Sequence, residues 1–400
     1  KNYFLFLFSI IPITFIIGSA ASVLNILLID LSFIIYIITK KNFSFLKSKA
    51  IFYLLAFYIY LIFNSFISIE FNQGFLRNFG FVRFIILFVA FNYFFIDKIF
   101  FHKVLKFWLI IISIVLIDVF IESFLGTNIF GYSGKKSGYG VRIVSFFKDE
   151  PIVGSFLSGF YLILIGYLLN SLKKKDLFLV YTLIILFLFA ILLTGERSST
   201  IKTFLGLGLF LFLIKSISLK FKFILTSTII ILILITITNS WFLKIRFSHI
   251  AHTFIKKDTI YFDLYSSGLH VFKNNKVFGV GNKNYRVETC DEQKRDIKEY
   301  LCNTHPHQIY IELLSEHGIL GTITIIYILF KLIFSKIISV FKTTNYLKLG
   351  TFIYMLFLFT PLLPSGSFFN NFLLTLFVIN LSIFYASDEE TNIFSQKKEI

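Results

Sequence analysis

Two histidines that flank a single proline are the residues best placed to do chemistry in this 400-residue chain. The segment Thr304-His305-Pro306-His307 precedes apolar residues at helical spacing, so it predicts a helix start with Thr304 as N-cap and Pro306 in the first turn. The helix dipole disfavours an imidazolium in a first turn, and a neutral imidazole can accept a proton. His307 is therefore a candidate general base and His305 a further candidate site residue. The alternative is a capping or interfacial pair. Two histidines this close do not form the usual helical zinc pair and no third ligand stands out, so no metal site is predicted.

Arginine is distributed unevenly along the chain. By the topology argued below, no arginine lies in a cytoplasmic connection, where lysine alone is used. The seven arginines are Arg77, Arg83, Arg142, Arg197, Arg246, Arg286 and Arg295. The guanidinium group is a planar fork that binds phosphate through two hydrogen bonds, whereas lysine is a point charge. The placement of every arginine on the outer side indicates a ligand there that carries phosphate.

One of these arginines stands in a short turn between two apolar runs. Arg197 lies in Thr194-Gly-Glu-Arg-Ser-Ser199, where hydroxyl groups at a helix start add donors for an anion. Glu196 is the alternative, because it could simply pair with Arg197. Arg142 lies in a glycine-rich stretch before another apolar run, and Arg286 follows Phe278-Gly-Val-Gly281 and Tyr285. Each arginine taken alone could be an anchor at the membrane interface.

Four further residues are candidates outside these motifs. Cys290 and Cys302 are the only cysteines and both lie in the long outer loop, where an oxidising compartment would permit a disulfide. Their spacing is not that of a metal knuckle. Asp30 and Asp118 lie within apolar runs, and such carboxylates are candidates for an ion or proton path. Asp118 is near the outer end of its run and is an expected partner for Arg83.

The elements that must position these residues are membrane-spanning helices. The chain is 56% hydrophobic, contains 56 phenylalanines and has a mean hydropathy of +0.81, far above a soluble domain. The apolar runs predict an all-α integral membrane protein with about twelve transmembrane helices. The predicted spans are residues 3–17, 20–38, 50–69, 79–96, 104–121, 151–170, 177–193, 199–214, 223–239, 318–334, 348–363 and 368–386. The net charge of +17 follows from the lysines that flank these spans, so nucleic-acid binding is not predicted.

The lysines also set the orientation. Alternate connections carry them, including Lys40, Lys98, Lys173, Lys220 and Lys336, which makes those connections and both termini cytoplasmic. The first run lacks a small-residue cleavage site, so no cleavable signal peptide is expected. A long, partly helical loop between the ninth and tenth spans faces the outside. We therefore predict one polytopic domain, residues 1–400, with an embedded outer subdomain at residues 240–317.

The motifs together resemble the superfamily of bacterial O-antigen ligases and O-antigen polymerases. The resemblance rests on His305-Pro-His307 and Thr194-Gly-Glu-Arg197-Ser, on Phe278-Gly-Val-Gly281 before Arg286, and on the twelve-span layout. After the histidines it includes Tyr310, Leu313, Leu314, Glu316 and Gly318. It covers essentially the whole chain, although the motifs lie mostly between residues 194 and 321. Gln308 stands where the family usually has asparagine.

The resemblance implies a glycosyltransferase of the inner membrane with its active site facing the periplasm. It implies transfer of a glycan from undecaprenyl pyrophosphate to a sugar hydroxyl of a lipid or glycan acceptor, without a metal or other cofactor. In that reaction His307 corresponds to the catalytic base, while Arg142, Arg197 and Arg286 correspond to residues that hold the pyrophosphate. Glu316 and Arg83 are further candidates.

Two alternatives stay open from the sequence. Ligase and polymerase share the donor and differ in the acceptor, and nothing in the chain separates them. A transporter or flippase for lipid-linked oligosaccharide would instead use Asp30 and Asp118 for ion coupling. No pair of broken helices in related halves, typical of transporters, is visible.

Overall fold

The structure, a computed structural model, describes residues 1–400 except 135, 138–139, 149, 172–176, 216, 257–259, 295 and 396–400. Seven helical stretches in the described part are long and apolar enough to cross a membrane, and three shorter apolar helices accompany them. The seven are Ser19–Lys40, Lys49–Phe66, Phe71–Phe94, Lys98–Leu125, Val153–Ser171, Leu219–Asn239 and Ile309–Lys342. The chain is an all-α, multi-pass membrane protein, as its apolar runs predict.

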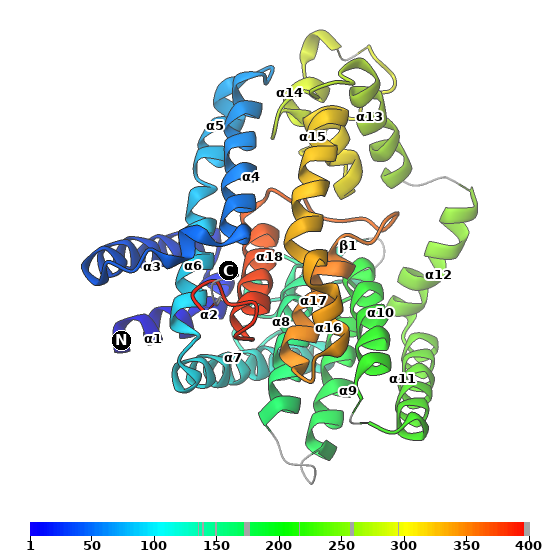
Figure 1. The fold of residues 1–400 in the computed structure, drawn as a ribbon. Coiled ribbons are helices and arrows are strands. Elements are labelled where there is room, and N and C mark those ends of the chain that lie inside the picture. Colours follow the sequence, from blue (N-terminus) through cyan, green and yellow to red (C-terminus); the bar gives the residue numbers. More distant parts are fainter. Residues whose placement is uncertain are drawn as a thin grey trace.

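Helices follow one another along nearly the whole described chain (Figure 1). In order they are α1 (Asn2–Ser9), α2 (Ile11–Ile17), α3 (Ser19–Lys40), α4 (Lys49–Phe66), α5 (Phe71–Phe79), α6 (Val82–Phe94), α7 (Lys98–Leu125), α8 (Val153–Ser171), α9 (Leu177–Leu193), α10 (Arg197–Leu213), α11 (Leu219–Asn239), α12 (Trp241–Lys256), α13 (Ile260–Asn274), α14 (Tyr285–Thr289), α15 (Ile309–Ile333), α16 (Ile337–Lys342), α17 (Tyr346–Leu358) and α18 (Asn371–Ala386). Short 3-10 turns are η1 (Ser44–Lys47), η2 (Ser145–Phe147), η4 (Glu292–Lys294) and η5 (Phe334–Lys336). A small antiparallel hairpin joins β1 (Lys136–Ser137) to β2 (Gly140–Val141).

Each predicted span overlaps a helix, but some helices begin or break where the apolar pattern continues. The first predicted span divides at Ile10 into α1 and α2, with Pro12 in the first turn of α2, a position that suits proline because its N–H would be unpaired there. The helix of the tenth predicted span, α15, starts at Ile309, before the predicted residue 318. Twelve crossings remain a prediction.

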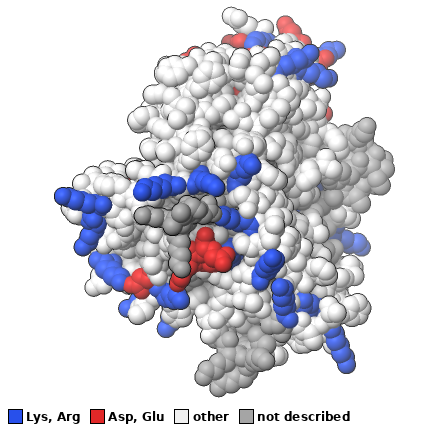
Figure 2. Space-filling view, viewed as in Figure 1, with Lys and Arg blue, Asp and Glu red and all other residues white. Residues whose placement is uncertain are grey.

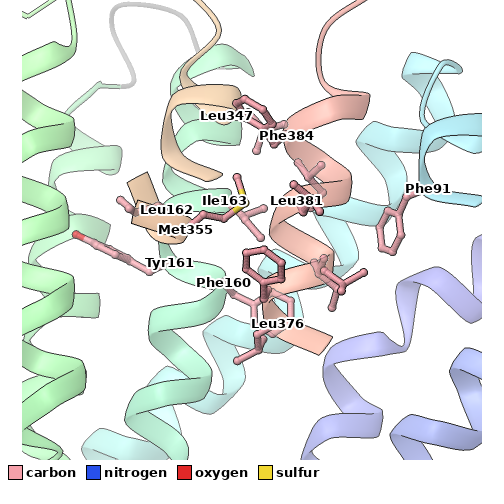
Figure 3. Packing of buried hydrophobic residues seen from close by; sticks show 14 of the residues in the cluster. Phe91, Phe160, Tyr161, Leu162, Ile163, Leu347, Met355, Leu376, Leu381 and Phe384 are labelled. Carbon is pink, nitrogen blue, oxygen red and sulfur yellow. The ribbon is translucent and has the colours of Figure 1, made fainter. Parts of the chain in front are cut away.

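Helix α8 lies at the centre of the bundle, and its residues Phe160, Tyr161 and Ile163 are fully buried. Figure 3 shows Phe160 and Ile163 beside Met355 of α17 and Leu376 of α18, whereas Tyr161 points away from them, toward Phe187 of α9. Helix α8 is apolar on every side, and neighbouring helices cover most of its surface. Close packing needs small residues, and a Cβ added at Gly166 would come within 2.7 Å of the Leu347 Cα atom. This centre holds in place the helix ends where the candidate arginines lie.

The outermost helices expose their apolar side chains instead. In α8, 78% of the membrane-spanning window is buried, against 11% in α11, so α11 is a lipid-facing helix. Figure 2 shows a broad uncharged surface between the charged top of the molecule and a lower band of lysine and arginine. This surface is the one expected to contact lipid, since charged groups are unfavourable in the hydrocarbon layer.

The long connection between α11 and α15 is partly helical, as predicted, and the glycine motif at residues 278–281 holds it against α15. Val280 N donates to Ser315 O (3.0 Å) and Gly281 N donates to Glu316 O (2.8 Å). This approach occurs where α15 is kinked at Gly318, which has a φ of 62°. A Cβ at Gly279 would lie 2.5 Å from His317 N, so the motif requires glycine for close backbone contact. The motif therefore sets the position of the outer helices relative to the histidine segment.

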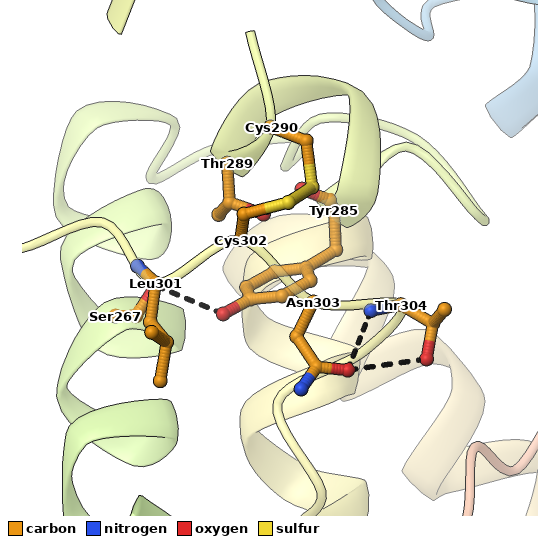
Figure 4. Close-up of a disulfide and its surroundings, with 8 residues drawn as sticks. All are labelled: Ser267, Tyr285, Thr289, Cys290, Leu301, Cys302, Asn303 and Thr304. Atoms are coloured by element: carbon orange, nitrogen blue, oxygen red, sulfur yellow. Dashed lines mark hydrogen bonds between the residues drawn. A yellow bond between two sulfur atoms is a disulfide. The ribbon is translucent and has the colours of Figure 1, made fainter. Parts of the chain in front are cut away.

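Cys290 and Cys302 form a disulfide within this outer segment (Figure 4). Beside it, Tyr285 donates its hydroxyl to Ser267 (2.9 Å), and Leu301 N donates to the same oxygen (3.0 Å). The disulfide and these hydrogen bonds tie α14 and the following loop to α13. The loop then leads directly into the two histidines.

Candidate functional site

A cavity of about 700 Å³ opens between α8, α10, α12, α13, α17 and the turn before α18. Its lining divides by chemistry. Polar and charged lining residues include Arg142, Ser155, Glu196, Arg197, Ser198, Ser199, Lys202, Arg246, His307, Ser365 and Asn370. Apolar and aromatic ones include Tyr161, Leu162, Tyr261, Tyr265, Ile353, Tyr354, Phe357, Leu358, Phe372 and Leu373. The cavity thus offers a charged region beside an apolar one, which suits an amphipathic ligand.

The turn between α9 and α10 positions Arg197, and Glu196 does not pair with it. The Glu196 carboxylate accepts hydrogen bonds from Gly154 N (2.7 Å), from Ser155 N (2.9 Å) and from the hydroxyls of Ser155 (2.7 Å) and Ser199 (3.1 Å). It therefore caps the N-terminus of α8, where a negative charge is favourable. Burial raises the pKa of Glu196, and the nearby Arg142 acts in the opposite direction. Among the described residues, Arg197 forms one long hydrogen bond, from Nη1 to Arg246 O (3.5 Å).

Three guanidinium groups line this end of the cavity, those of Arg142, Arg197 and Arg246. Arg142 donates to Pro151 O (3.0 Å), and Arg246 donates to Gly195 O (3.0 Å). Within the described part of the chain, no ion pair to Arg142, Arg197 or Arg246 is found. Burial, together with the charges of Arg142 and Arg197, lowers the pKa of Arg246 to about 10. Three cations that repel one another, with the hydrogen-bonded Glu196 as the nearby carboxylate, are suited to an anion of high charge.

The histidine segment lies just before α15 and not in its first turn. The helix begins at Ile309, and Gln308 is its N-cap, with the side chain accepting from Ile311 N (2.8 Å). The predicted start at Thr304 is therefore wrong. Proline disfavours helical backbone in the residue before it, and His307 has a left-handed φ of 55°. Its carbonyl accepts from Ser365 N (2.8 Å), which ties the segment to the turn before α18.

The two imidazoles lie against each other at the edge of the cavity. The His305 and His307 ring centroids are 4.0 Å apart, and the Tyr261 ring meets His307 edge-on at 6.0 Å. Of the two, only His307 lines the cavity. His305 instead contacts Thr304, with 3.0 Å between Nδ1 and the hydroxyl.

Both histidines are neutral at ordinary pH. Burial and, to a smaller extent, the neighbouring His305 lower the pKa of His307 to about 4, and the Glu312 carboxylate opposes this shift. Burial and the Lys283 ammonium lower the pKa of His305 to about 4. The neutral state expected from a helix dipole thus has burial as its main cause, because His307 lies outside the helix.

The structure brings together some of the predicted site residues and separates others. His307, Arg142 and Arg197 share the cavity, whereas Arg286 lies exposed on α14 and does not line it. Glu316 is fully buried in α15 outside the cavity. Arg83 also lies outside, and its Nη2 donates to Asn371 Oδ1 (3.1 Å).

The intramembrane carboxylates have different surroundings. Asp118 accepts from the Ser145 hydroxyl (2.5 Å) and from Ile129 N (3.0 Å), so the expected pairing with Arg83 is wrong. These donors come from the loop after α7, which folds back over the helix end. Asp30 is buried, and neither of its carboxylate oxygens has a hydrogen-bond partner in the described residues.

Arg246 and Lys202 line the cavity but were not singled out from the sequence. Arg246 belongs to the set of seven arginines, so its residue type indicated a phosphate contact. Its position in the sequence did not show that it would reach the cavity. Lys202 is the one charged residue within the predicted span 199–214. A lysine inside an apolar span is itself a sign of function.

Residues 182–326 of the chain match the family model described as O-antigen ligase. The match confirms the resemblance to the O-antigen ligase and polymerase superfamily. It contains the turn with Arg197, the glycine motif and both histidines, whereas Arg142 and helices α8 and α17 of the cavity lie outside it. No curated protein matches the chain.

Proposed function

We propose that this O-antigen ligase-type chain transfers a glycan from undecaprenyl pyrophosphate to a sugar hydroxyl at the periplasmic face of the inner membrane. One observation carries the proposal: a single cavity holds three arginines that form no ion pair with any described residue, and a neutral histidine lies on its edge. A lipid pyrophosphate needs several fixed donors near an apolar region, and both are present here. The periplasmic placement follows from the lysine distribution, with both termini cytoplasmic.

In the proposed reaction, His307 accepts the proton of the acceptor hydroxyl as that oxygen attacks the anomeric carbon of the donor glycan. A new glycosidic C–O bond forms, and the bond between the anomeric carbon and the phosphate oxygen breaks. The leaving group is undecaprenyl pyrophosphate, which takes the bonding electron pair. Arg142, Arg197 and Arg246 stabilise the charge that develops on it. Arg246 takes the role that the sequence suggested for Arg286, since Arg286 lies outside the cavity.

The proposed acceptor is the lipid A core in a ligase or a growing glycan in a polymerase. The surface lipopolysaccharide of a strain that lacks this protein, resolved on a gel, separates the two. A bare core with long glycan left on the lipid carrier indicates a ligase, whereas a core with a single repeat indicates a polymerase. An unchanged ladder would contradict both and would favour another surface glycan or the flippase alternative. For a flippase, Asp118 is already satisfied by hydrogen bonds, so Asp30 alone would be available for coupling.

The pKa of His307 predicts how transfer depends on pH. Only the neutral imidazole accepts a proton, and the lowered pKa of about 4 keeps it neutral through the mildly acidic range. The transfer rate of purified protein should therefore change less than about twofold between roughly pH 7.5 and pH 5.5. An unperturbed histidine would lose about tenfold over that range, because its pKa is near 6.5. Single-turnover rates with saturating donor would measure this, and an acid limb near 6.5 would contradict a buried base.

A further inference from the structure

We infer that Lys202 on α10 binds the phosphate that is esterified to the lipid, and so marks where the charged part of a prenyl diphosphate ends and its chain begins. This inference rests on the proposed function and deepens it, because it assigns the two phosphates of the donor to different groups. The arginines then hold the phosphate that carries the glycan.

The surroundings of Lys202 call for an anion. Its Nζ donates to Leu358 O (3.2 Å), a carbonyl in the last turn of α17 that has no partner within its own helix. An ammonium has three donors, and among the described residues no carboxylate lies within 4 Å of this one. A charge at this depth is unfavourable unless it is paired or faces a polar cavity. Lys202 faces the cavity, and an anionic ligand there would complete its coordination.

Helix geometry places Lys202 at the right depth for the second phosphate. It is five residues beyond Arg197 on α10, which corresponds to roughly 7–8 Å along the helix axis. Both side chains are long, so they can reach adjacent phosphates from positions one to two turns apart. Since α10 enters the membrane from the arginine turn, Lys202 is the deeper of the two and lies nearer the chain of the lipid.

Beyond Lys202, the cavity becomes apolar in the direction of the prenyl chain. Gly206 lies one turn further along α10, where an added Cβ would be 3.5 Å from side-chain atoms of Ile353 and Phe357. The glycine leaves space in this part of the cavity, and the side chains nearest to it, those of Ile353, Phe357 and Leu162, are apolar. A phosphate at Lys202 would thus have its first isoprene units directed between α10 and α17.

Four cationic residues line the cavity against one carboxylate, Glu196, whose oxygens are occupied by four hydrogen bonds. Arg142, Arg197 and Arg246 gather at the outer turn, and Lys202 alone lies further in. A lipid monophosphate held by its chain would contact Lys202 without contacting the arginines. A diphosphate would contact both groups, and this difference makes the assignment testable.

The test measures dissociation constants of the full chain, purified in detergent, for geranylgeranyl diphosphate, geranylgeranyl monophosphate and geranylgeraniol. Lys202→Met keeps the length of the side chain and removes its charge. It should weaken binding of both phosphates roughly tenfold or more, as expected for the loss of one charge-assisted hydrogen bond, and leave the alcohol unchanged. Lys202→Arg should restore most of the lost affinity. Lys220→Met, on the exposed start of α11, is the matched control and should change none of the three.

Unchanged binding of both phosphates to Lys202→Met would overturn the assignment. An equal loss for all three ligands would also overturn it, because the lysine would then act only through packing. Arg197→Ala should weaken the diphosphate but not the monophosphate. If that loss occurs while Lys202→Met has no effect, only the present inference fails. If wild type binds the diphosphate no better than the alcohol, the proposed donor site fails, and this inference fails with it.

Discussion

His307→Ala and His307→Asn should each lower the rate of glycan transfer by roughly 10²–10⁴-fold, the range of a lost general base. The imidazole is the basic side chain that reaches the cavity from the histidine segment, and its lowered pKa leaves it free to accept a proton. Transfer of radiolabelled glycan from lipid-linked donor by purified protein would measure the loss. Both variants should still insert in the membrane and elute like wild type.

The two variants distinguish the role of the imidazole side chain from the role of the backbone conformation at residue 307. His307 has a φ of 55°, a conformation that asparagine adopts readily and alanine does not. If His307→Asn kept activity while His307→Ala lost it, the residue would matter for its backbone and the assignment as a base would fail. His270→Ala is the matched control, because His270 contacts the Tyr300 ring outside the cavity and should retain full activity.

The helices and part of the site could be predicted because they depend on local properties. Long apolar runs have one stable arrangement in a bilayer, so the positions of the helices follow from them. His307 and Arg197 could be singled out because ionisable residues at the ends of apolar runs are uncommon, and their charge is unfavourable near the hydrocarbon layer unless it is paired. The glycine motif could be noticed, but its role as a close backbone contact with the kink at Gly318 depends on a partner far along the chain.

The errors came from competing local and distant partners. Thr304 is a better N-cap by propensity than Gln308, yet the constraint from Pro306 and the turned backbone at His307 delay the helix to Ile309. The alternative that Glu196 pairs with Arg197 was left open by the sequence, because the N-terminus of α8 that binds this carboxylate approaches only when the helices pack. Which arginine of the outer loop enters the cavity is likewise decided by how α12 and α14 pack, and sequence spacing carries no information on that.

That distinction between outer arginines has a direct consequence for activity. Arg246→Gln, which keeps a side-chain donor, should lower kcat/KM for the donor by roughly 10²-fold, because one preorganised contact to the leaving group is lost. Arg286→Ala should stay within about threefold of wild type, since that side chain is exposed on α14. If Arg286→Ala lost activity and Arg246→Gln kept it, the pyrophosphate contact would belong to Arg286, and α12 would not contribute to the site.

Arg197 should show the strongest effect of the arginine substitutions. Arg197→Lys keeps the charge and loses the planar fork, and we expect kcat/KM for the donor to fall roughly 10²–10³-fold. The reason is geometric: Glu196 is held by α8, so Arg197 has no described partner except the carbonyl of Arg246 and is free to take two phosphate oxygens at once. A lysine would offer a point charge from a shorter reach. Wild-type turnover by Arg197→Lys would show that Arg197 acts only as an interfacial anchor, and the pyrophosphate site would then need to be built from Arg142 and Arg246 alone.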